Sequence, residues 1–213
     1  MLPVLRAMLG RYGHTLPDAA ILQLYREFEA EAESGPYRRY RDVLQSVMRA
    51  FAARLGFDPS FSDVRSLPES VPAWAPFPDT VAALRILKSR YKLAVISNID
   101  DDLFAKTGKL LGVEFDAVVT AEQAGSYKPS LRNFEFALRR LAVAPERLLH
   151  VAQSIYHDVV PARSLGISTV WVNRKSARPG IGAVRTAEGR ADLEVPDLAA
   201  LASLAVPGAQ EMH

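Results

Sequence analysis

Hydrophobic residues in the first third of the chain recur every three or four positions, which is the spacing of an amphipathic helix. The first run comprises Leu2, Leu5, Met8 and Leu9. A second helix is expected to have Thr15 as its N-cap and Pro17 early in its first turn. A third helix would bury Tyr40, Val43, Leu44, Val47, Met48 and Phe51. Because no strand pattern occurs before residue 70, this region is predicted to form a compact helical module.

The pattern changes after a proline-rich joint at residues 72–78, where short apolar runs begin to alternate with helical ones. The predicted strands span residues 93–97, 117–120, 148–152 and 169–172. The predicted helices span residues 80–90, 103–111, 131–141 and 159–165. Gly112 and Gly166 follow two of these helices as C-caps. Such alternation predicts an α/β fold in which helices cover both faces of a parallel sheet.

These patterns divide the chain into three parts. Residues 1–72 are predicted to form a small all-α domain, and residues 73–206 an α/β core. Residues 207–213 are predicted to be a frayed tail. Within the core, residues 174–190 are basic and contain glycine, so they are predicted to form a loop.

Composition narrows the classes of function. The net charge is +2, an excess too small to indicate binding to nucleic acid or to an anionic membrane. The sequence has no cysteine, which excludes disulfides and thiolate chemistry. No segment approaches the roughly 18 apolar residues of a membrane span, and no secretory leader pattern follows Met1. We therefore expect a cytoplasmic protein with no nucleic-acid or membrane partner.

Two polar residues, Ser97 and Asn98, end one predicted strand and precede a helix. In open α/β sheets, ligands bind at the carboxyl ends of the strands. A hydroxyl and backbone N–H groups at this position can hold an anion. The alternative interpretation is that Ser97 is only a turn residue or a helix cap. The acids at 100–102 are interpreted as first-turn residues facing the helix dipole rather than as metal ligands.

A lysine and an aspartate complete the set of candidate residues. Lys128 precedes Pro129, which favours an extended backbone at the lysine. A lysine held in this way can offset the charge of a nucleophilic carboxylate and of an anionic substrate. Asp158 follows the strand at 148–152, where it can orient Lys128 or position a hydrolytic water. The alternatives are a solvated surface lysine and an ordinary acid at a helix N-terminus.

Together these motifs resemble those of the haloacid dehalogenase-like (HAD) superfamily, and within it the type II (S)-2-haloacid dehalogenases. The residues that carry the resemblance are Val95–Asn98, Tyr127–Pro129 and Val151–Asp158, with Pro76–Pro78 and Trp171–Arg174 beside them. The resemblance implies a HAD-like Rossmannoid core with a parallel sheet, and a small all-α cap domain at residues 1–72. It also implies catalytic roles for Lys128, Asp158 and Ser97, and substrate-binding roles for Asn98 and Ser154.

The reaction implied by the resemblance is hydrolytic displacement of halide from a small 2-halo carboxylic acid. An aspartate attacks the carbon that bears the halogen, and water hydrolyses the resulting ester. The stretch Leu24–Arg26 resembles the part of the cap in which these enzymes place an arginine for the substrate carboxylate. Arg26 is the candidate, because a guanidinium binds a carboxylate through two hydrogen bonds, and the alternative is a surface helix arginine. The resemblance implies no cofactor, and it is compatible with a homodimer.

The sequence departs from the family pattern at the nucleophile. It contains no Asp-x-x-Gly-Thr segment, and Met1 falls inside the helix expected after the first core strand. We therefore expect the first core strand to be absent, either because the start codon was assigned too late or because this member lacks its nucleophile. Two polar groups near the substrate are also replaced. Phe134 stands in place of a tyrosine, and Gln153–Ile155 in place of Ser-Ser-Asn.

Two other functions stay open. A phosphatase of the superfamily would use Mg²⁺, and such enzymes typically have an acidic ligand in a Gly-Asp pair where this chain has Ala152 and Gln153. A non-catalytic pseudoenzyme would bind a small anion or a protein partner. Without a central strand, buried backbone groups would go unsatisfied at about 1–3 kcal/mol each. Poor stability, aggregation or a rearranged sheet is therefore expected, together with no dehalogenase activity from residues 1–213.

Overall fold

The computed structural model describes residues 1–174 and 188–207. These residues form two compact units: residues 1–74, and residues 75–174 together with 188–207. Most of the predicted loop at 174–190, and all but the first residue of the predicted tail, lie outside the described residues. The described chain is a mixed α/β protein in which helices predominate and the strand pairs are parallel.

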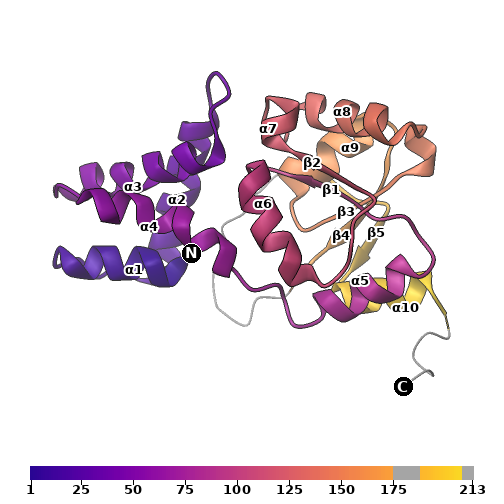
Figure 1. Cartoon of the computed structure of the whole chain (residues 1–213), viewed down its shortest axis with the longest axis horizontal. Coiled ribbons are helices and arrows are strands. Elements are labelled where there is room, and N and C mark those ends of the chain that lie inside the picture. The colour runs from indigo at the N-terminus through magenta and orange to yellow at the C-terminus, as the bar shows by residue number, and fades with distance from the viewer. Residues whose placement is uncertain (175–187, 208–213) are drawn as a thin grey trace. The chain divides into compact units, whose positions relative to one another are not determined.

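The first unit consists of packed helices (Figure 1). It contains α1 (Leu2–Arg11), α2 (Asp18–Glu33), α3 (Tyr40–Leu55), α4 (Phe61–Ser70) and the 3₁₀ turn η1 (Val71–Ala73). Residues 1–74 contain no strand, as predicted. The apolar residues that the sequence assigns to the core of the first and third helices are buried. Edge-on packing of Phe28 against Phe51, with ring centroids 5.1 Å apart, joins α2 to α3.

The start of α2 differs from the prediction. The helix begins at Asp18 with Pro17 as its N-cap, so the expected cap at Thr15 is wrong. The physical reason is the position of Asp18, whose carboxylate lies in the first turn near the positive end of the helix dipole. The same carboxylate accepts a hydrogen bond from Nε of Arg6 in α1 at 2.8 Å. The start of α2 thus carries an ion pair with α1.

A capping box starts α4, which the sequence analysis did not predict. The N–H of Asp63 donates to Oγ of Ser60 at 3.1 Å, and the N–H of Ser60 donates to Oδ2 of Asp63 at 3.2 Å. Asp63 is buried, and it also accepts hydrogen bonds from Tyr12 and Arg11 in or next to α1. Burial alone would raise the pKa of Asp63, but the hydrogen bonds from Ser60, Tyr12 and Arg11 outweigh it and lower the pKa to about 2.

The second unit is built from short strands and the helices that connect them. Its strands are β1 (Ala94–Ser97), β2 (Ala117–Thr120), β3 (Leu149–Ala152), β4 (Ser168–Val172) and β5 (Leu193–Val195). Its α-helices are α5 (Thr80–Lys88), α6 (Asp101–Thr107), α7 (Ala121–Ala124), α8 (Leu131–Leu141), α9 (Val160–Ser164) and α10 (Leu198–Ala205). Shorter turns are η2 (Gly108–Leu111), η3 (Pro145–Arg147) and the π-helical η4 (Ile155–Val159). The four predicted strands are confirmed to within one residue at each end.

The strands form two parallel sheets, not the single sheet that was predicted. One sheet pairs β1 with β2, and the other has the order β3-β4-β5. A continuous sheet requires neighbouring strands about 4.8 Å apart that share a hydrogen-bonded ladder, and no ladder joins β1 to β3 in the described residues. Val170 in β4, which has strands on both sides, is 1% exposed.

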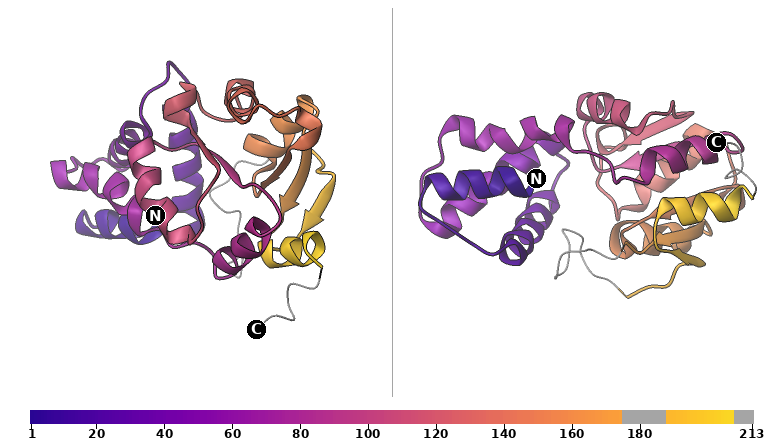
Figure 2. Two further views of the ribbon diagram at one scale, coloured as in Figure 1. Left: turned by 45° about the vertical axis from the view of Figure 1, so that its right-hand side comes forward. Right: turned by 90° about the horizontal axis from the view of Figure 1, so that it is seen from below.

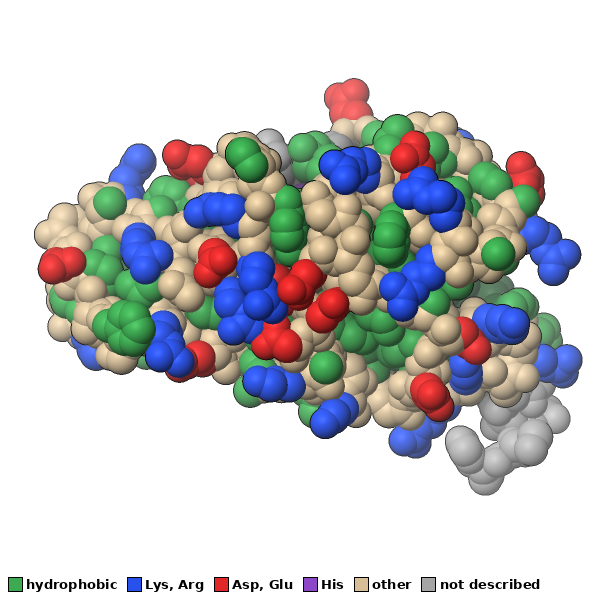
Figure 3. Space-filling model, turned by 45° about the horizontal axis from the view of Figure 1, so that its top comes forward, with side chains coloured by type: hydrophobic (Ala, Val, Ile, Leu, Met, Phe, Trp, Pro, Cys, Tyr) green, Lys and Arg blue, Asp and Glu red, His purple; other side chains and the backbone are tan. Residues whose placement is uncertain are grey.

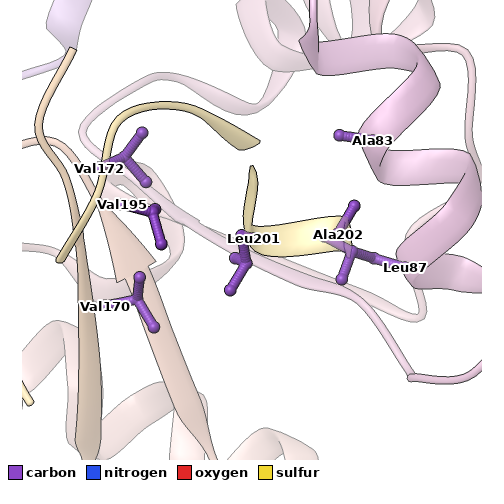
Figure 4. Packing of buried hydrophobic residues seen from close by; sticks show 7 residues of the cluster. All are labelled: Ala83, Leu87, Val170, Val172, Val195, Leu201 and Ala202. Atoms are coloured by element: carbon purple, nitrogen blue, oxygen red, sulfur yellow. The ribbon is translucent and has the colours of Figure 1, made fainter. Parts of the chain in front are cut away.

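Helices lie on both sides of the strands in this unit. Figures 1 and 2 show α5 and α10 on one side and α8 and α9 on the other. The first side is held by a buried cluster of Ala83, Leu87, Val170, Val172, Val195, Leu201 and Ala202 (Figure 4). The second side is held by a cluster around Phe134, Ala162 and Ile167. Ile96 of β1 packs against this second cluster, so apolar contacts join the two sheets, although no backbone ladder does so among the described residues.

A bidentate ion pair connects three elements on the first side. Asp79, the N-cap of α5, accepts hydrogen bonds from both terminal nitrogens of Arg174, at 2.7 and 2.9 Å. The N–H of Leu198 at the start of α10 donates to the same carboxylate at 2.9 Å. The hydrogen bonds from Arg174 hold the pKa of Asp79 below its ordinary value. Because Arg174 follows β4, this carboxylate links the beginnings of two helices to the end of a strand.

Gly112 ends the η2 turn that continues α6, as predicted for a C-cap. Its φ is +67°, in the left-handed region that favours glycine. A Cβ at this position would lie 2.9 Å from Cγ1 of Val81 in α5. Both the backbone angle and the close neighbour therefore require glycine here.

Charges of both signs are interspersed on the face shown in Figure 3, with apolar side chains between them. The small net charge of +2 agrees with such a mixed surface. Among the helices in the described ranges, none combines the length and the apolar character needed to cross a membrane.

Candidate active site

Lys128 lies between α7 and α8 and spans the carboxyl ends of two strands from separate sheets. Its Nζ donates to the carbonyl oxygen of Ile96 in β1 at 2.8 Å. The same Nζ donates to Oδ1 of Asp158, which follows β3, at 2.6 Å. The side chain of Lys128 is 11% exposed and that of Asp158 is 9% exposed. The alternative interpretation of Lys128 as a solvated surface lysine is therefore wrong.

Asn98 holds the backbone of this lysine at two points. The N–H of Lys128 donates to Oδ1 of Asn98 at 2.8 Å, and Nδ2 of Asn98 donates to the carbonyl oxygen of Lys128 at 3.1 Å. The Lys128–Pro129 peptide bond is cis. The double contact makes Asn98 a positioning residue for Lys128. The direct contact with substrate expected of Asn98 stays a prediction.

Asp158 lies in the wide η4 turn, where its carboxylate accepts hydrogen bonds from two side chains, Lys128 and His150. Its Oδ1 also lies 2.9 Å from Nε2 of His150 in β3. An ionised carboxylate has no proton to donate, so the hydrogen of this bond is on Nε2. Burial alone would raise the pKa of Asp158, but the charge of Lys128 and the hydrogen bond from His150 outweigh it and hold the pKa well below its ordinary value. Asp158 is therefore ionised at neutral pH.

Several polar groups at this position retain bonding capacity. The Lys128 ammonium has three N–H donors, of which two are engaged. Among the described residues, neither Oδ2 of Asp158 nor the hydroxyl of Ser97 has a hydrogen-bond partner. Ser97 stands between Ile96 and Asn98, both of which contact Lys128. The cation and the carboxylate oxygen can bind a small anion and accept a proton from water, and Ser97 adds a hydroxyl at the end of β1.

Ser154 is buried and caps the η4 turn. Its hydroxyl accepts a hydrogen bond from the N–H of His157 at 3.0 Å and lies 3.1 Å from Nδ1 of the same histidine. The preceding residue, Gln153, is exposed, and its carbonyl oxygen accepts a hydrogen bond from Nε1 of Trp171 at 2.9 Å. These contacts fix the segment that leaves β3. The substrate contact expected of Ser154 stays a prediction.

Arg26 lies in the other unit, in the middle of α2. Its side chain is half-buried, and it forms no ion pair with the residues that the structure describes. The neighbouring Tyr25 is buried, and its hydroxyl donates to Oε1 of Glu29 at 2.7 Å. The role of Arg26 toward a substrate carboxylate stays a prediction.

The residues present fit a magnesium ion poorly. Asp158 would be the natural ligand, but its Oδ1 already contacts the Lys128 ammonium and His150. Gln153 offers a neutral amide where a carboxylate would be needed. Asp101 in α6 accepts hydrogen bonds from Thr120 and Gln123, as expected of a first-turn acid in the fold. Within residues 1–174 and 188–207, no three acidic or histidine side chains gather as metal ligands.

His150 is the site residue that the sequence analysis missed. It lies inside β3 with 10% of its side chain exposed, and its ring packs edge-on against Phe134 of α8 with centroids 5.1 Å apart. A histidine within the apolar run of residues 148–152 was the available signal. A polar ring in a buried strand needs a hydrogen-bond partner, and here the partner is Asp158.

Comparison with known proteins identifies the family. Residues 11–166, which include every site residue named above, match the haloacid dehalogenase-like hydrolases. The chain belongs to this family. The resemblance seen in the sequence motifs is thereby confirmed, and with it the assignment of the chain to the HAD superfamily hydrolases.

Two relatives of this HAD hydrolase differ in their reactions. The (S)-2-haloacid dehalogenase H-109 of Pseudomonas putida is 30% identical over 180 residues, which make up 80% of each chain. A glyceraldehyde 3-phosphate phosphatase of Methanothermobacter thermautotrophicus is 42% identical over 102 residues, but the match covers only 46% of this chain and 45% of the relative.

The solved structure of the L-2-haloacid dehalogenase from Xanthobacter autotrophicus shares the fold of this HAD hydrolase. The alignment covers 97% of this chain and 93% of the other, with a TM-score of 0.78 and 22% identity. At that identity the likeness establishes the fold alone, and the reaction has to be argued from the site.

Proposed function

We propose that this HAD hydrolase site is built to displace halide from a small 2-halo carboxylic acid. The observation that carries the proposal is the buried Lys128 ammonium, held by Asp158 and by the carbonyl oxygen of Ile96 at the end of β1. A fixed cation at that point can neutralise an attacking carboxylate together with an anionic substrate. The match to the H-109 dehalogenase over 80% of each chain supports this reaction over others in the family.

The reaction proceeds through two displacements. An oxygen of an aspartate bonds to the substrate carbon, and the carbon–halogen bond breaks as halide leaves with the electron pair. Water then attacks the carbonyl carbon of the ester while Asp158 takes one of its protons. The bond from that carbon to the oxygen of the 2-hydroxy acid breaks, and the leaving alkoxide takes the proton from Asp158. The carboxyl group that remains loses its proton to solvent, which restores the carboxylate. Lys128 and Ser97 hold the aspartate in both steps. Arg26 would bind the substrate carboxylate, and Asn98 and Ser154 would line the site.

The segment in which the resemblance places the nucleophile does not occur in this sequence. No Asp-x-x-Gly-Thr segment occurs in residues 1–213. Asp158 already accepts hydrogen bonds from Lys128 and His150. We therefore expect purified residues 1–213 to release no halide from (S)-2-chloropropionate. Measurable halide release by this chain would contradict the assignment of the nucleophile to that segment.

A gain-of-function experiment tests the proposal. A designed β-strand ending in Asp-x-x-Gly-Thr is placed before Met1, and any in-frame sequence found before the Met1 codon is tested in the same way. Halide release from (S)-2-chloropropionate is then measured for the extended chain. The matched control carries asparagine in place of the added aspartate. We expect release by the first and none by the control, and we expect Lys128→Met to abolish it. A folded extended chain that releases no halide would refute the dehalogenase.

A small-molecule phosphatase is the second candidate. The 42% identity to a glyceraldehyde 3-phosphate phosphatase over 102 residues favours it. A phosphatase would require Mg²⁺ to neutralise the phosphoryl group. If the extended chain hydrolyses glyceraldehyde 3-phosphate only with Mg²⁺ and releases no halide, the phosphatase replaces the dehalogenase. Binding of a small carboxylate or phosphate without turnover of either would instead support a pseudoenzyme.

A further inference from the structure

We propose that His150 is a positioning residue that aims the carboxylate of Asp158 at the hydrolytic water. The inference rests on the proposed function, because it concerns the step in which the ester is hydrolysed. It assigns a role to a buried strand residue that does not itself contact substrate.

Two donors meet on one oxygen of Asp158. Nζ of Lys128 lies 2.6 Å from Oδ1, and Nε2 of His150 lies 2.9 Å from the same atom. Oδ2 has no partner among the described residues, so it is the oxygen left for water. The terminal torsion of an aspartate is broad when nothing fixes it. Two donors that come from different elements hold the carboxylate in one orientation, with Oδ2 as the free base.

His150 is itself held firmly. It pairs with Thr169 in the ladder between β3 and β4, and the ring of Phe134 packs against it. Phe134 is fully buried in α8, so the imidazole has little room to rotate. Lys128 differs, because its long side chain is shared between Ile96, Asp158 and the reacting carboxylate. His150 therefore keeps Oδ1 occupied whenever the ammonium shifts toward the substrate.

The first test needs no turnover and uses residues 1–213 as they are. Side-chain ¹⁵N NMR reports which ring nitrogen of His150 carries the hydrogen. We expect the Nε2–H tautomer at pH 7, with Nε2–H bonded to Asp158. The Nδ1–H tautomer would overturn the proposal, because Nε2 would then have no hydrogen to donate.

Two variants separate positioning from packing. Glutamine at this position, His150→Gln, keeps an N–H donor, whereas His150→Phe keeps an aromatic ring without one. The pKa of the Asp158 carboxyl, followed by ¹³C NMR, is expected to rise by about one unit or more in His150→Phe and to stay near the wild-type value in His150→Gln. His14→Gln, in the helical unit, is the control and should change nothing. An unchanged Asp158 pKa in folded His150→Phe would refute the inference, and if that variant does not fold, the wild-type tautomer decides.

Kinetics of the extended chain distinguish this inference from the proposed function. Halide is released before the ester is hydrolysed, so His150→Phe is expected to keep a burst of about one halide per site while steady turnover falls by roughly 100-fold. His150→Gln should recover most of the turnover. Equal loss of burst and turnover in His150→Phe would contradict a role in the second step. No halide release by the parent extended chain would refute the dehalogenase, and the NMR results would still decide how His150 acts on Asp158.

Discussion

Replacing Lys128 with methionine is expected to destabilise the fold as well as the site. Methionine keeps most of the length and apolar packing of the lysine side chain and removes the charge. The variant leaves the Asp158 carboxylate buried without a cation beside it. The loss follows from the burial of the pair, since a charge taken out of water is costly unless it is compensated.

The size of the effect follows from the geometry. The two side chains are 11% and 9% exposed, and the donor and acceptor atoms are 2.6 Å apart. Removing one partner of such a buried pair costs about 3–5 kcal/mol. His150 continues to donate to Asp158, so we expect a loss near the lower end, about 3 kcal/mol at pH 7. Against a typical total stability of about 5–15 kcal/mol, this is a large fraction.

Urea unfolding followed by far-UV circular dichroism measures the loss, and its pH dependence identifies the cause. In the wild type the pKa of Asp158 is depressed in the folded state. Its contribution to stability is therefore complete above the pKa of an unfolded aspartate and is lost as pH falls below that value. The difference between the wild type and Lys128→Met should thus be largest at neutral pH. It should shrink progressively as pH falls from about 5 toward the depressed pKa of Asp158.

A second lysine provides the matched control. Lys88 pairs with Asp116, but both side chains are 32% exposed, so Lys88→Met should cost far less than Lys128→Met. The double variant Lys128→Met/Asp158→Asn removes the buried charge and should recover much of the loss. If Lys128→Met is no more harmful than Lys88→Met, or if the double variant recovers nothing, the reasoning from burial is wrong.

Three further predictions concern the framework. Gly112→Ala should cost about 1–3 kcal/mol in urea unfolding, because alanine is strained at positive φ and meets a neighbour, whereas Gly10→Ala, in open space, should be neutral or stabilising. Asp79→Ala should cost about 2 kcal/mol by breaking the bidentate pair with Arg174, and a loss no larger than that of Lys88→Met would argue against it. Asp63, with its depressed pKa, should contribute stability above about pH 4 that is lost toward about pH 2. The Asp63→Asn variant should show no such acid transition by circular dichroism.

The elements that the sequence predicted best are those whose signals are local. The strand Ala117–Thr120 and the helix Leu131–Leu141 were predicted to the residue. In the strand, β-branched residues mark an extended run, and in the helix the apolar residues recur at helical spacing after the cap at Ser130. Such features depend on neighbouring residues in the chain, so a sequence is enough to find them.

The elements that were missed depend on distant partners. Leu193–Val195 has only three residues and becomes a strand because β4 lies beside it. The α10 helix has a cap at Asp197, yet its nearly uniform apolar sequence carries little helical periodicity. In the site, the residue types of Lys128 and Asp158, a cation and a carboxylate, were enough to suggest their chemical roles. The convergence of His150 and Lys128 on one carboxylate oxygen could not be read from the sequence, because 30 residues separate Lys128 from Asp158.

Lys128 connects the ends of β1 and β3, which belong to separate sheets, through a carbonyl oxygen on one side and a carboxylate on the other. The lengths of the two hydrogen bonds made by its ammonium therefore depend on the distance between the two sheets. Because no hydrogen-bonded ladder joins the two sheets among the described residues, moderate hydrostatic pressure should lengthen these bonds before the helices lose their structure. In this hydrolase, we expect the hydrogen bonds of the site to be lost at a lower pressure than the helical structure.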